Sequence, residues 1–357
     1  MTALQRFQEA LSALGVDGAI ISSELNQRYL SDFSYSDGYL LVTPSHAYLL
    51  ADFRYIEAAK AAVKGFEIIR PEGSMLDGLG ALIRENGLRQ IALEDATLSC
   101  AEFNRFSKAF EGCTLATGAS ELLKDLRMVK TDAELDRIAK AQALTDLAFD
   151  HILGFLSPDR TEREVALELE FFMRKQGAEA VAFETIAVSG KASSLPHGVP
   201  RDVKLEKGFL TMDFGAKLDG YCSDMTRTVV IGKADEEMKK IYSTVLCAQI
   251  AALEQIREGL SCREADEIAR SIIREAGYGP CFGHSLGHGV GLYIHEAPSL
   301  STRADEKSIL RRGNVVTIEP GIYLEGKYGC RIEDMVAIDH SGKLRNFTQS
   351  PKTLIEL

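Results

Sequence analysis

The chain has 357 residues, of which 45% are hydrophobic and 26% are charged, and its formal net charge at pH 7 is −11. This length predicts two domains, and the acidic balance argues against binding nucleic acid or an anionic membrane through a general basic surface. No apolar run is long enough to span a bilayer. From the acidic charge and the lack of such a run, we expect neither a nucleic-acid partner nor a membrane partner. The seven cysteines are scattered and contain no C-x-x-C pair, which favours free thiols in the cytoplasm.

The first third of the sequence alternates strand-like and helix-like segments. Residues 18–21, 39–42 and 48–50 are rich in strand-forming residues. Residues 53–63 and 76–86 have helical patterns. This alternation predicts an α/β domain. The segment contains no G-x-G-x-x-G motif and little that indicates chemistry.

A domain boundary is expected near residue 125, which gives an N-terminal domain of residues 1–124 and a C-terminal domain of residues 125–357. Three capping boxes follow this boundary, each with a Ser or Thr three residues before a Glu, and each predicts the start of a helix. The boxes begin at Thr131, Thr161 and Ser261.

The second and third of these helices resemble each other. A shift of 100 residues superimposes two sets of equivalent residues, namely Thr161, Arg163, Glu164, Arg174 and Gly177 on Ser261, Arg263, Glu264, Arg274 and Gly277. Two amphipathic helices can match this well by chance. If the repeat is genuine, the C-terminal domain consists of two related halves, and a site can lie between them.

Each expected half also contains a hairpin-like segment with strong strand propensity in both arms. The arms cover residues 209–215 and 221–232 in the first hairpin and residues 315–323 and 329–338 in the second. The turns are expected at residues 217–220 and near Gly326.

Each of the four arms carries one carboxylate among apolar neighbours. These residues are Asp213, Asp224, Glu319 and Glu333. Residues placed symmetrically about a hairpin turn face each other across the ladder at about 5 Å. We therefore expect Asp213 opposite Asp224 and Glu319 opposite Glu333.

Two facing pairs of carboxylates are unfavourable, and burial increases the repulsion. One interpretation is a buried ion-pair network with Arg227 and Arg331 as the counter-charges. The other is a metal site, because two divalent cations carry the +4 that balances four carboxylates. With one neutral imidazole added, the oxygen-rich set suits Mn²⁺, Co²⁺ or Zn²⁺, and a water held between two such ions becomes hydroxide near neutral pH.

Residues 283–296, GHSLGHGVGLYIHE, place three of the seven histidines among glycines. The same letters match the serine-hydrolase elbow G-x-S-x-G, with Ser285 as the nucleophile and with His340 and Asp305 available for a triad. The elbow needs a strand, a sharp turn and a helix, and the glycines and proline around Ser285 disfavour that context. A serine hydrolase also leaves the four carboxylates unexplained.

Five residues in their contexts resemble the ligand set of the creatinase/prolidase/aminopeptidase P family of metallopeptidases. They are Asp213, Asp224, His288, Glu319 and Glu333, in TMDFG, SDMTRT, GHSLGHGVG, TIEPGIY and RIED. The resemblance is strong over residues 125–357 and weaker in the first third, through NQRYLSDF and DFRYIEAA. It implies an α/β (α+β) protein with a creatinase-like N-terminal α/β domain and a C-terminal pita-bread domain of two pseudo-two-fold halves.

The resemblance also implies roles for the five ligands. Asp213 is expected to chelate one ion, and His288 and Glu319 are expected to hold the other. Asp224 and Glu333 are expected to bridge the two ions. Glu319 is further expected to act as the general base on the attacking water.

Four other residues match family positions around the substrate. The resemblance implies that His295 contacts the substrate and stabilises the tetrahedral intermediate, and that His197 lies on the substrate side. His284 and Arg331 are expected to orient ligands or substrate.

The function implied is hydrolysis of the Xaa–Pro bond of dipeptides or short peptides by a hydroxide bridging two ions, with Mn²⁺ expected before Co²⁺ or Zn²⁺. The resemblance further implies a homodimer, and the expected location stays the cytoplasm, on the evidence of the free thiols. A catalytically inactive pita-bread binding module is the non-enzymatic alternative, although all five ligands are present here. The sequence leaves open whether the enzyme is a dipeptidase or an aminopeptidase. Several short prolidases have an arginine that helps to recognise the substrate carboxylate at the position where this chain has Ser299. Arg303 is a nearby residue that can take its place.

Overall fold

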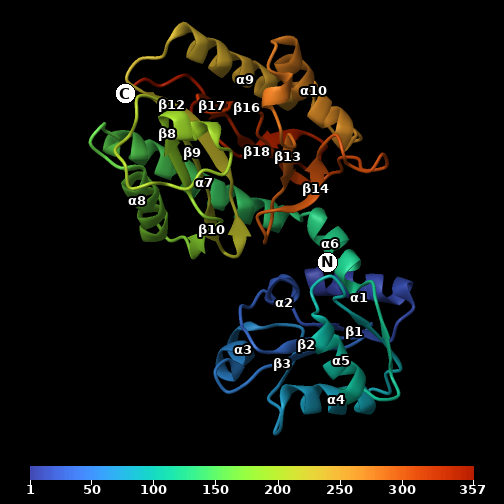
Figure 1. Cartoon of the computed structure of the whole chain (residues 1–357). Coiled ribbons are helices and arrows are strands. Elements are labelled where there is room, and N and C mark those ends of the chain that lie inside the picture. Colours follow the sequence, from blue (N-terminus) through green and yellow to red (C-terminus); the bar gives the residue numbers. More distant parts are fainter. The chain divides into compact units, whose positions relative to one another are not determined.

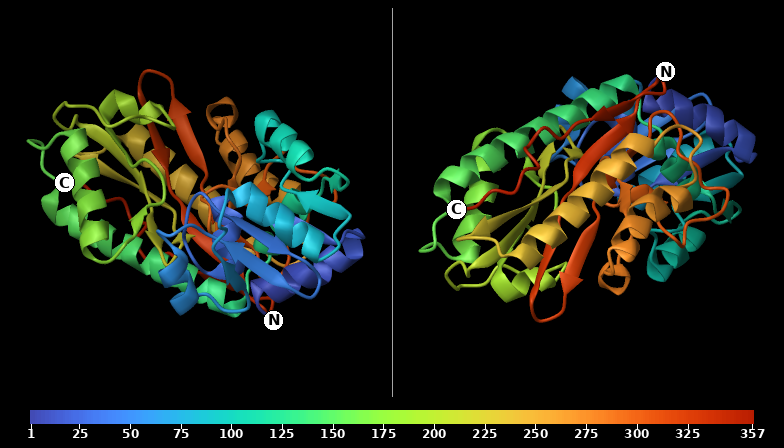
Figure 2. Two further views of the ribbon diagram at one scale, coloured as in Figure 1. Left: turned by 90° about the horizontal axis from the view of Figure 1, so that it is seen from below. Right: turned by 90° about the horizontal axis from the view of Figure 1, so that it is seen from above.

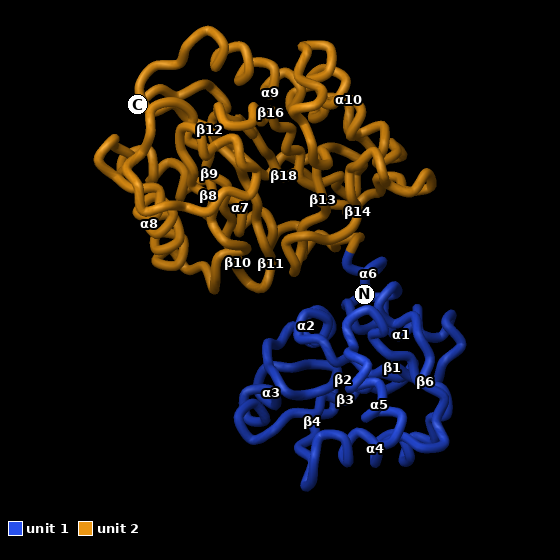
Figure 3. The backbone as a smooth tube through the Cα atoms, in the orientation of Figure 1, with its two compact units in different colours: residues 1–127 blue, residues 128–357 orange.

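The computed structural model describes residues 1–357, and the chain divides into two compact units, Met1–Arg127 and Met128–Leu357 (Figure 3). Residue 125, where the sequence analysis places the boundary, lies inside helix α6 (Ala119–Met128). None of the helices is both long and apolar enough to cross a lipid bilayer.

Unit 1 is built on one mixed sheet of six strands in the order β4-β3-β2-β1-β5-β6. Its strands are β1 Gly18–Ile21, β2 Tyr39–Val42, β3 Ala47–Leu50, β4 Glu67–Ile69, β5 Gln90–Leu93 and β6 Thr114–Ala116. Its helices are α1 Ala3–Leu14, α2 Glu24–Ser31, α3 Ile56–Ala62, α4 Met75–Glu85, α5 Cys100–Ala109 and α6. The expected α/β alternation is therefore present, and one core joins apolar residues of the sheet to those of α4 and α5, such as Leu41, Leu79 and Phe106.

Unit 2 contains four long helices that pack in consecutive pairs. They are α7 Asp132–Phe155, α8 Glu162–Lys175, α9 Glu236–Gln255 and α10 Cys262–Glu275, with short 3₁₀ helices at η1 Gly190–Ser194 and η2 Gly279–Cys281. All three capping boxes form as expected: Thr131, Thr161 and Ser261 each accept a hydrogen bond from the backbone of the Glu three residues later. Such caps satisfy amide groups that the first helical turn leaves without partners.

The strands of unit 2 form two main antiparallel sheets, β12-β9-β8 and β14-β13-β15-β18-β19. The strands up to residue 231 are β7 Ala180–Val181, β8 Ile186–Ser189, β9 Gly208–Phe214, β10 Ala216–Leu218, β11 Tyr221–Cys222 and β12 Met225–Ile231. Those after residue 286 are β13 Gly287–Gly289, β14 Glu296–Leu300, β15 Val315–Ile318, β16 Gly321–Leu324, β17 Tyr328–Arg331, β18 Asp334–Ile338 and β19 Leu344–Asn346. Figure 1 shows α8 and α10 at the periphery of unit 2, with strands between them.

The two halves of unit 2 repeat the same local design. Helices α8 and α10 both have 14 residues. Their N-cap residues make equivalent isolated bridges, Thr161 to Lys204 and Ser261 to Ile309. Each half also has its own hydrophobic cluster beneath its helix pair. These equivalences extend well beyond two similar amphipathic helices, so the repeat is genuine.

The first hairpin departs from the expected register. Its turn residues Asp219 and Gly220 both have positive φ, 48° and 85°, as a two-residue type I′ turn requires. The turn is therefore centred one residue later than expected, and Asp213 pairs with Thr226. The prediction that Asp213 faces Asp224 directly is wrong: the two residues are diagonal neighbours across the ladder.

The second hairpin has the expected register. Ile318 pairs with Asp334 on one side and Gly321 pairs with Arg331 on the other, so Glu319 lies opposite Glu333. The strand pairing is interrupted at these two acids: Glu319 lies between β15 and β16, and Glu333 lies between β17 and β18. Figure 2 shows the β16–β17 hairpin as a projecting arm of unit 2.

Candidate metal centre and active site

A cavity of about 400 Å³ opens within unit 2, and residues of both halves line it. The lining residues are Phe183, Glu184, Ile186, Pro196, His197, Asp213, Asp224, His284, Ser285, His288, Ile294, His295, Glu319, Arg331 and Glu333. Every site residue expected from the sequence is among them. The fold therefore brings together expected site residues that are up to 136 positions apart in the chain, from His197 to Glu333.

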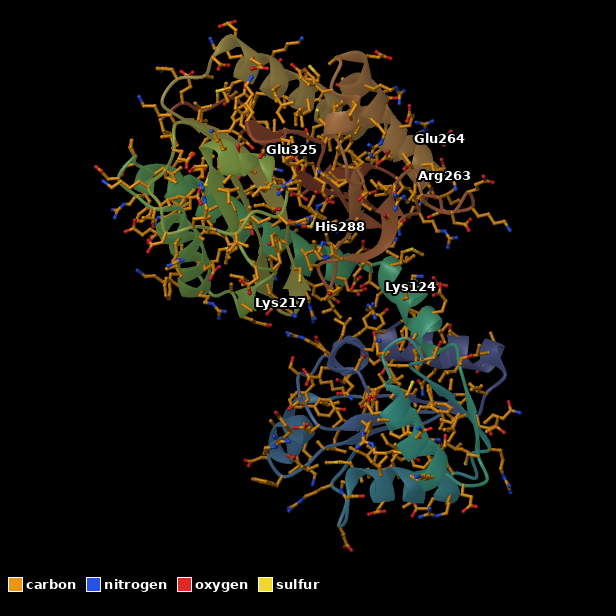
Figure 4. All side chains as sticks on the ribbon, in the orientation of Figure 1. Lys124, Lys217, Arg263, Glu264, His288 and Glu325 are labelled. Carbon is orange, nitrogen blue, oxygen red and sulfur yellow. The ribbon has the colours of Figure 1, made fainter.

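His288 lies among the carboxylates of this cavity, and Figure 4 shows it in the interior of unit 2. Its Nε2 atom is 3.5 Å from Oδ2 of Asp224 and 3.5 Å from Oε1 of Glu319. Asp224, His288 and Glu333 each offer a ligand atom, and these atoms lie within 4.8 Å of one another. This spacing suits residues that share a metal ion.

The carboxylates of the cavity repel one another in a buried setting. Burial raises the pKa of Glu319 to about 8, with a further contribution from the charge of Asp213. Burial and the neighbouring carboxylates raise the pKa values of Asp224 and Glu333 well above their usual range. The group therefore needs either protons or cations to be stable at neutral pH.

Two observations favour cations over protons. Oδ1 of Asp213 is buried and has no hydrogen-bond partner, which is costly for a carboxylate unless a ligand occupies that side. Nδ1 of His288 lies 3.1 Å from the carbonyl oxygen of Gly289. Because a carbonyl only accepts, Nδ1 carries the proton and the Nε2 lone pair faces the acids. An oxygen-rich set with one imidazole nitrogen fits divalent ions such as Mn²⁺, Co²⁺ or Zn²⁺.

The ion-pair interpretation accounts for only part of the cluster. Nη2 of Arg331 donates to Oδ2 of Asp213 at 2.6 Å, so Arg331 is a true counter-charge. Arg227 instead pairs with Asp334 at 2.8 Å and makes no side-chain ion pair with the four acids. One guanidinium cannot neutralise four carboxylates, and the part of the ion-pair interpretation that assigns Arg227 to this cluster is wrong.

His284 and Arg331 are linked through a tyrosine. Nη1 of Arg331 donates to the hydroxyl of Tyr323 at 2.7 Å, and that hydroxyl lies 3.0 Å from Nε2 of His284. Nδ1 of His284 lies 2.8 Å from the carbonyl oxygen of Ser285, so Nδ1 carries the proton and Nε2 accepts from the tyrosine. Burial, followed by the charge of Arg331, lowers the pKa of His284 to about 3, so its imidazole is neutral.

Three further residues, not among those expected from the sequence, hydrogen-bond the expected site residues. Tyr323 holds the Arg331 guanidinium. The hydroxyl of Thr226 donates to Glu333 at 2.7 Å, and the hydroxyl of Thr317 donates to Glu319 at 3.1 Å. All three lie inside the motifs SDMTRT and TIEPGIY, where their alternation with the ligands was the available signal.

The two remaining histidines of the expected site lie at the more open part of the cavity. His197 and His295 are both exposed, in contrast to the carboxylates. The ring of His295 lies 4.4 Å from that of His288, centre to centre. Burial, followed by the neighbouring His288, lowers the pKa of His295. Both histidines can therefore contact a ligand that enters the cavity.

The backbone around Ser285 does not form the nucleophile elbow of a serine hydrolase. Ser285 lies between η2 and strand β13, so a strand follows it where the elbow needs a helix. His340 contacts the backbone carbonyl of Lys130 and is not among the cavity residues. The serine-hydrolase alternative is not supported.

The glycines of residues 283–296 have a steric role. A Cβ atom on Gly289 would lie 2.2 Å from the carbonyl oxygen of Ala297, and one on Gly287 would lie 1.9 Å from that of Thr317. We expect Gly289→Ala to destabilise the protein by about 1–3 kcal/mol or more, because rigid backbone would have to move. Gly283→Ala is the control, since no atom lies within 4 Å of its added Cβ. Equal midpoints of thermal unfolding for the two variants would contradict this account.

Comparison with known proteins assigns the chain to a family. The model of metallopeptidase family M24 matches residues 136–340, and that of the creatinase/prolidase N-terminal domain matches residues 4–129. The chain therefore belongs to metallopeptidase family M24. This confirms the family resemblance and the expected fold class, a creatinase-type N-terminal domain followed by a pita-bread domain.

Individual relatives match along the whole chain. A Xaa-Pro dipeptidase of Pyrococcus horikoshii is 37% identical over 358 residues, covering 99% of this chain and 98% of the relative. The solved structure of a Xaa-Pro dipeptidase from Bacillus anthracis is 41% identical with a TM-score of 0.95, covering 99% of both chains. The solved structure of an X-Pro aminopeptidase from Thermotoga maritima is 38% identical with a TM-score of 0.92, and the match covers 98% of this chain and 100% of that one.

Family membership, together with the fit of the donor set, identifies the protein as a metallopeptidase that uses divalent metal ions. The alternative of an inactive binding module finds no support among these relatives, which carry the names of peptidases.

Proposed function

We propose that the protein hydrolyses the Xaa–Pro bond of dipeptides or short peptides with two divalent ions, Mn²⁺ before Co²⁺ or Zn²⁺. The observation that carries the proposal is the convergence of four carboxylates and one imidazole on one cavity. The full-length relatives named Xaa-Pro dipeptidase and X-Pro aminopeptidase support the substrate class.

In this proposal the five ligands divide two ions between them. Asp213 would hold one ion, and His288 with Glu319 would hold the other. Asp224 and Glu333 would bind both, since carboxylates can bridge. Two divalent ions match the charge of the four acids, which explains how so many carboxylates share one buried site.

When bound, the ions would supply an acidified water molecule and polarise the scissile carbonyl. Glu319 would accept the proton of the attacking water and return it to the proline nitrogen as the C–N bond breaks. His197 and His295 would donate hydrogen bonds to the carbonyl oxygen, on which negative charge develops. The chain from His284 through Tyr323 to Arg331 would keep Asp213 oriented.

The apolar part of the cavity suits a proline side chain. Phe183, Ile186 and Ile294 line it beside the metal ligands. Neither Ser299 nor Arg303 is among the lining residues. We propose that the enzyme cleaves both dipeptides and longer peptides, because a Xaa-Pro dipeptidase and an X-Pro aminopeptidase resemble the chain to a similar degree.

Hydrolysis of Ala-Pro, Ala-Pro-Ala and Ala-Ala by the Mn²⁺-loaded protein at matched concentrations tests both points. We expect release of alanine from the first two peptides and slow turnover of Ala-Ala. Cleavage of Ala-Ala as fast as Ala-Pro would refute the proline specificity. Cleavage of Ala-Pro alone would restrict the enzyme to dipeptides.

We further propose that catalysis belongs to the C-terminal domain and that the enzyme is a cytoplasmic homodimer. Support for the compartment comes from the seven cysteines, all of which are free thiols. Support for the dimer comes from the family resemblance alone, and light scattering of the purified protein tests it.

A further inference from the structure

A buried ion pair lies directly behind the loop that carries His295. Nζ of Lys130 is 3.3 Å from Oε2 of Glu296, and the side chains of the two residues are only 1% and 4% exposed. Lys130 immediately precedes the N-cap of α7, and Glu296 immediately follows His295 at the start of β14. The two residues are 166 positions apart in the sequence. The proposed mechanism assigns no role to either.

The Glu296 carboxylate is hydrogen-bonded within the His295 loop, residues 291–296. Its Oε1 accepts a hydrogen bond from the backbone N–H of Tyr293 at 3.1 Å. The N–H of Gly291 donates to the carbonyl of Tyr293, and the N–H of Cys222 donates to the carbonyl of Gly291. The loop is thus closed on itself and attached to β11, two residues before the ligand Asp224.

Gly291 lies close against this ion pair. A Cβ atom on Gly291 would lie 2.6 Å from Oε2 of Glu296 and 3.1 Å from Cε of Lys130. Glycine is therefore needed for the loop to lie against the lysine. A shift of the Gly291 backbone toward Lys130 would bring it against the ion pair, and a shift away would separate two charges that have little access to water.

The backbone of Lys130 is itself fixed. Its N–H donates to the carbonyl of Gly313 at 2.8 Å, and its carbonyl oxygen lies 2.9 Å from Nε2 of His340. Two residues earlier, the carbonyl of Met128 accepts from the side chain of Asn314 at 3.0 Å. The ammonium group is therefore presented from a rigid segment, as a fixed anchor for the loop.

We propose that Lys130 is a positioning residue for His295: it holds Glu296 and thereby fixes the loop that presents His295 to the cavity. A buried carboxylate deprived of a neighbouring cation gains by moving toward water. Such a movement would displace the adjacent histidine, and a misplacement of about 1 Å can cost on the order of 100-fold in rate. The effect on rate rests on the proposed peptidase function, whereas the effect on geometry does not.

A double-mutant cycle tests the link to His295. We expect Lys130→Met to lower kcat on Ala-Pro by about 10- to 100-fold while the bound metal, measured by elemental analysis, is unchanged. In a His295→Ala background the same substitution should lower kcat little further, because the group that it positions is gone. If the fold-losses in kcat of the two single variants simply multiply in the double variant, the proposal is overturned.

Glu296→Gln provides a milder route should Lys130→Met fold poorly. The amide oxygen can still accept from the N–H of Tyr293, but the NH2 group then faces Lys130 and the ion pair is lost. We expect a smaller fall in kcat that is also masked by His295→Ala. Lys130→Arg, which retains the charge, should recover part of the rate lost in Lys130→Met. No fall in kcat for either neutral variant would overturn the proposal.

The position of the His295 ring is measured without reference to activity. In protein labelled with ¹³C-histidine, the His295 signal is assigned by its loss in His295→Ala. We expect it to shift in Lys130→Met and Glu296→Gln, while the signal of exposed His46 stays in place. An unmoved His295 signal in a folded variant refutes the positioning role. This NMR measurement tests the positioning role of Lys130 even if the wild-type protein fails to cleave Xaa–Pro peptides. That failure would refute the proposed function.

Arg201→Met is the matched control for general destabilisation. Arg201 pairs with the fully buried carboxylate of Glu162 at 2.6 Å in the other half of unit 2. Its removal should also lower the midpoint of thermal unfolding, since it too leaves a buried acid without its cation. The His295 signal should be unmoved. A shift as large as that in Lys130→Met would show that loss of any buried ion pair disturbs His295, and would overturn the specific role.

Discussion

Removal of the divalent ions is expected to abolish peptide hydrolysis and to lower the midpoint of thermal unfolding, by an amount that increases with pH. Without cations, the buried carboxylates can be accommodated only by taking up protons. Burial and neighbouring carboxylates raise the pKa values of Asp224 and Glu333, and burial raises that of Glu319 to about 8.

The sign of the pH effect follows from proton binding. An acid whose pKa is higher in the folded state binds more protons there than in the unfolded state. The contribution of Glu319 is fully present below its ordinary pKa of 4.5 and is lost as the pH rises through about 8. The metal-free protein should therefore lose stability from pH 5 to pH 8. Bound cations replace the protons, so the loaded protein should escape this loss.

The expected difference is large enough to measure. An ion at 100 times its dissociation constant stabilises the folded state by about 2.7 kcal/mol, or roughly 5–10 °C for a unit of this size. Calorimetry at pH 5.5, 7 and 8, with chelator or with Mn²⁺, gives the difference directly. If the difference in unfolding midpoint between the Mn²⁺-loaded and the chelated protein becomes smaller as the pH rises, the metal-centre assignment is refuted. Full activity in protein free of metal would also refute it.

Glu319→Gln is expected to make the metal-free protein more stable and the enzyme nearly inactive. The amide removes one of the mutually repelling charges while keeping the size of the side chain and the contact with Thr317. In the loaded enzyme it removes the proposed general base, which typically contributes about 10²- to 10⁴-fold to the rate. Stability and activity should therefore change in opposite directions.

The matched control is Glu325→Gln, the same substitution at an exposed position of the β16–β17 turn, which is labelled in Figure 4. It should change neither the unfolding midpoint nor kcat beyond experimental error. Calorimetry on the chelated variants and kcat on Ala-Pro with Mn²⁺ measure the two effects. A metal-free Glu319→Gln protein that is less stable than wild type would show that repulsion at this position is unimportant.

The cavity residues were predictable from the sequence because they lie in short motifs whose residue types define the chemistry. Asp213 and His288 stand in TMDFG and GHSLGHGVG, and both line the cavity. The predicted pairing of Asp213 is wrong because a turn over residues 217–220 is centred one residue before the turn at Asp219-Gly220. That dipeptide favours a two-residue type I′ turn and so sets the register.

Contacts between distant segments were not predictable from one sequence. The pairing of Lys130 with Glu296 joins the start of unit 2 to a loop 166 residues later, and neither residue stands out in its local pattern. The hydrogen bond from Tyr323 to His284 likewise depends on how the β16 strand lies against residues 283–286. Helix starts were easier, because a capping box is complete within four residues.

The repeat in unit 2 has a consequence for how the protein acquires its metal. Asp213 and Asp224 belong to the first half, and Glu319 and Glu333 belong to the second. The first half alone supplies only two of the five proposed ligands, Asp213 and Asp224, and lacks the proposed imidazole ligand His288. With the proposed ligands, the complete site exists only once residue 333 has been synthesised and the two halves have packed together, so metal binding would stabilise the finished fold.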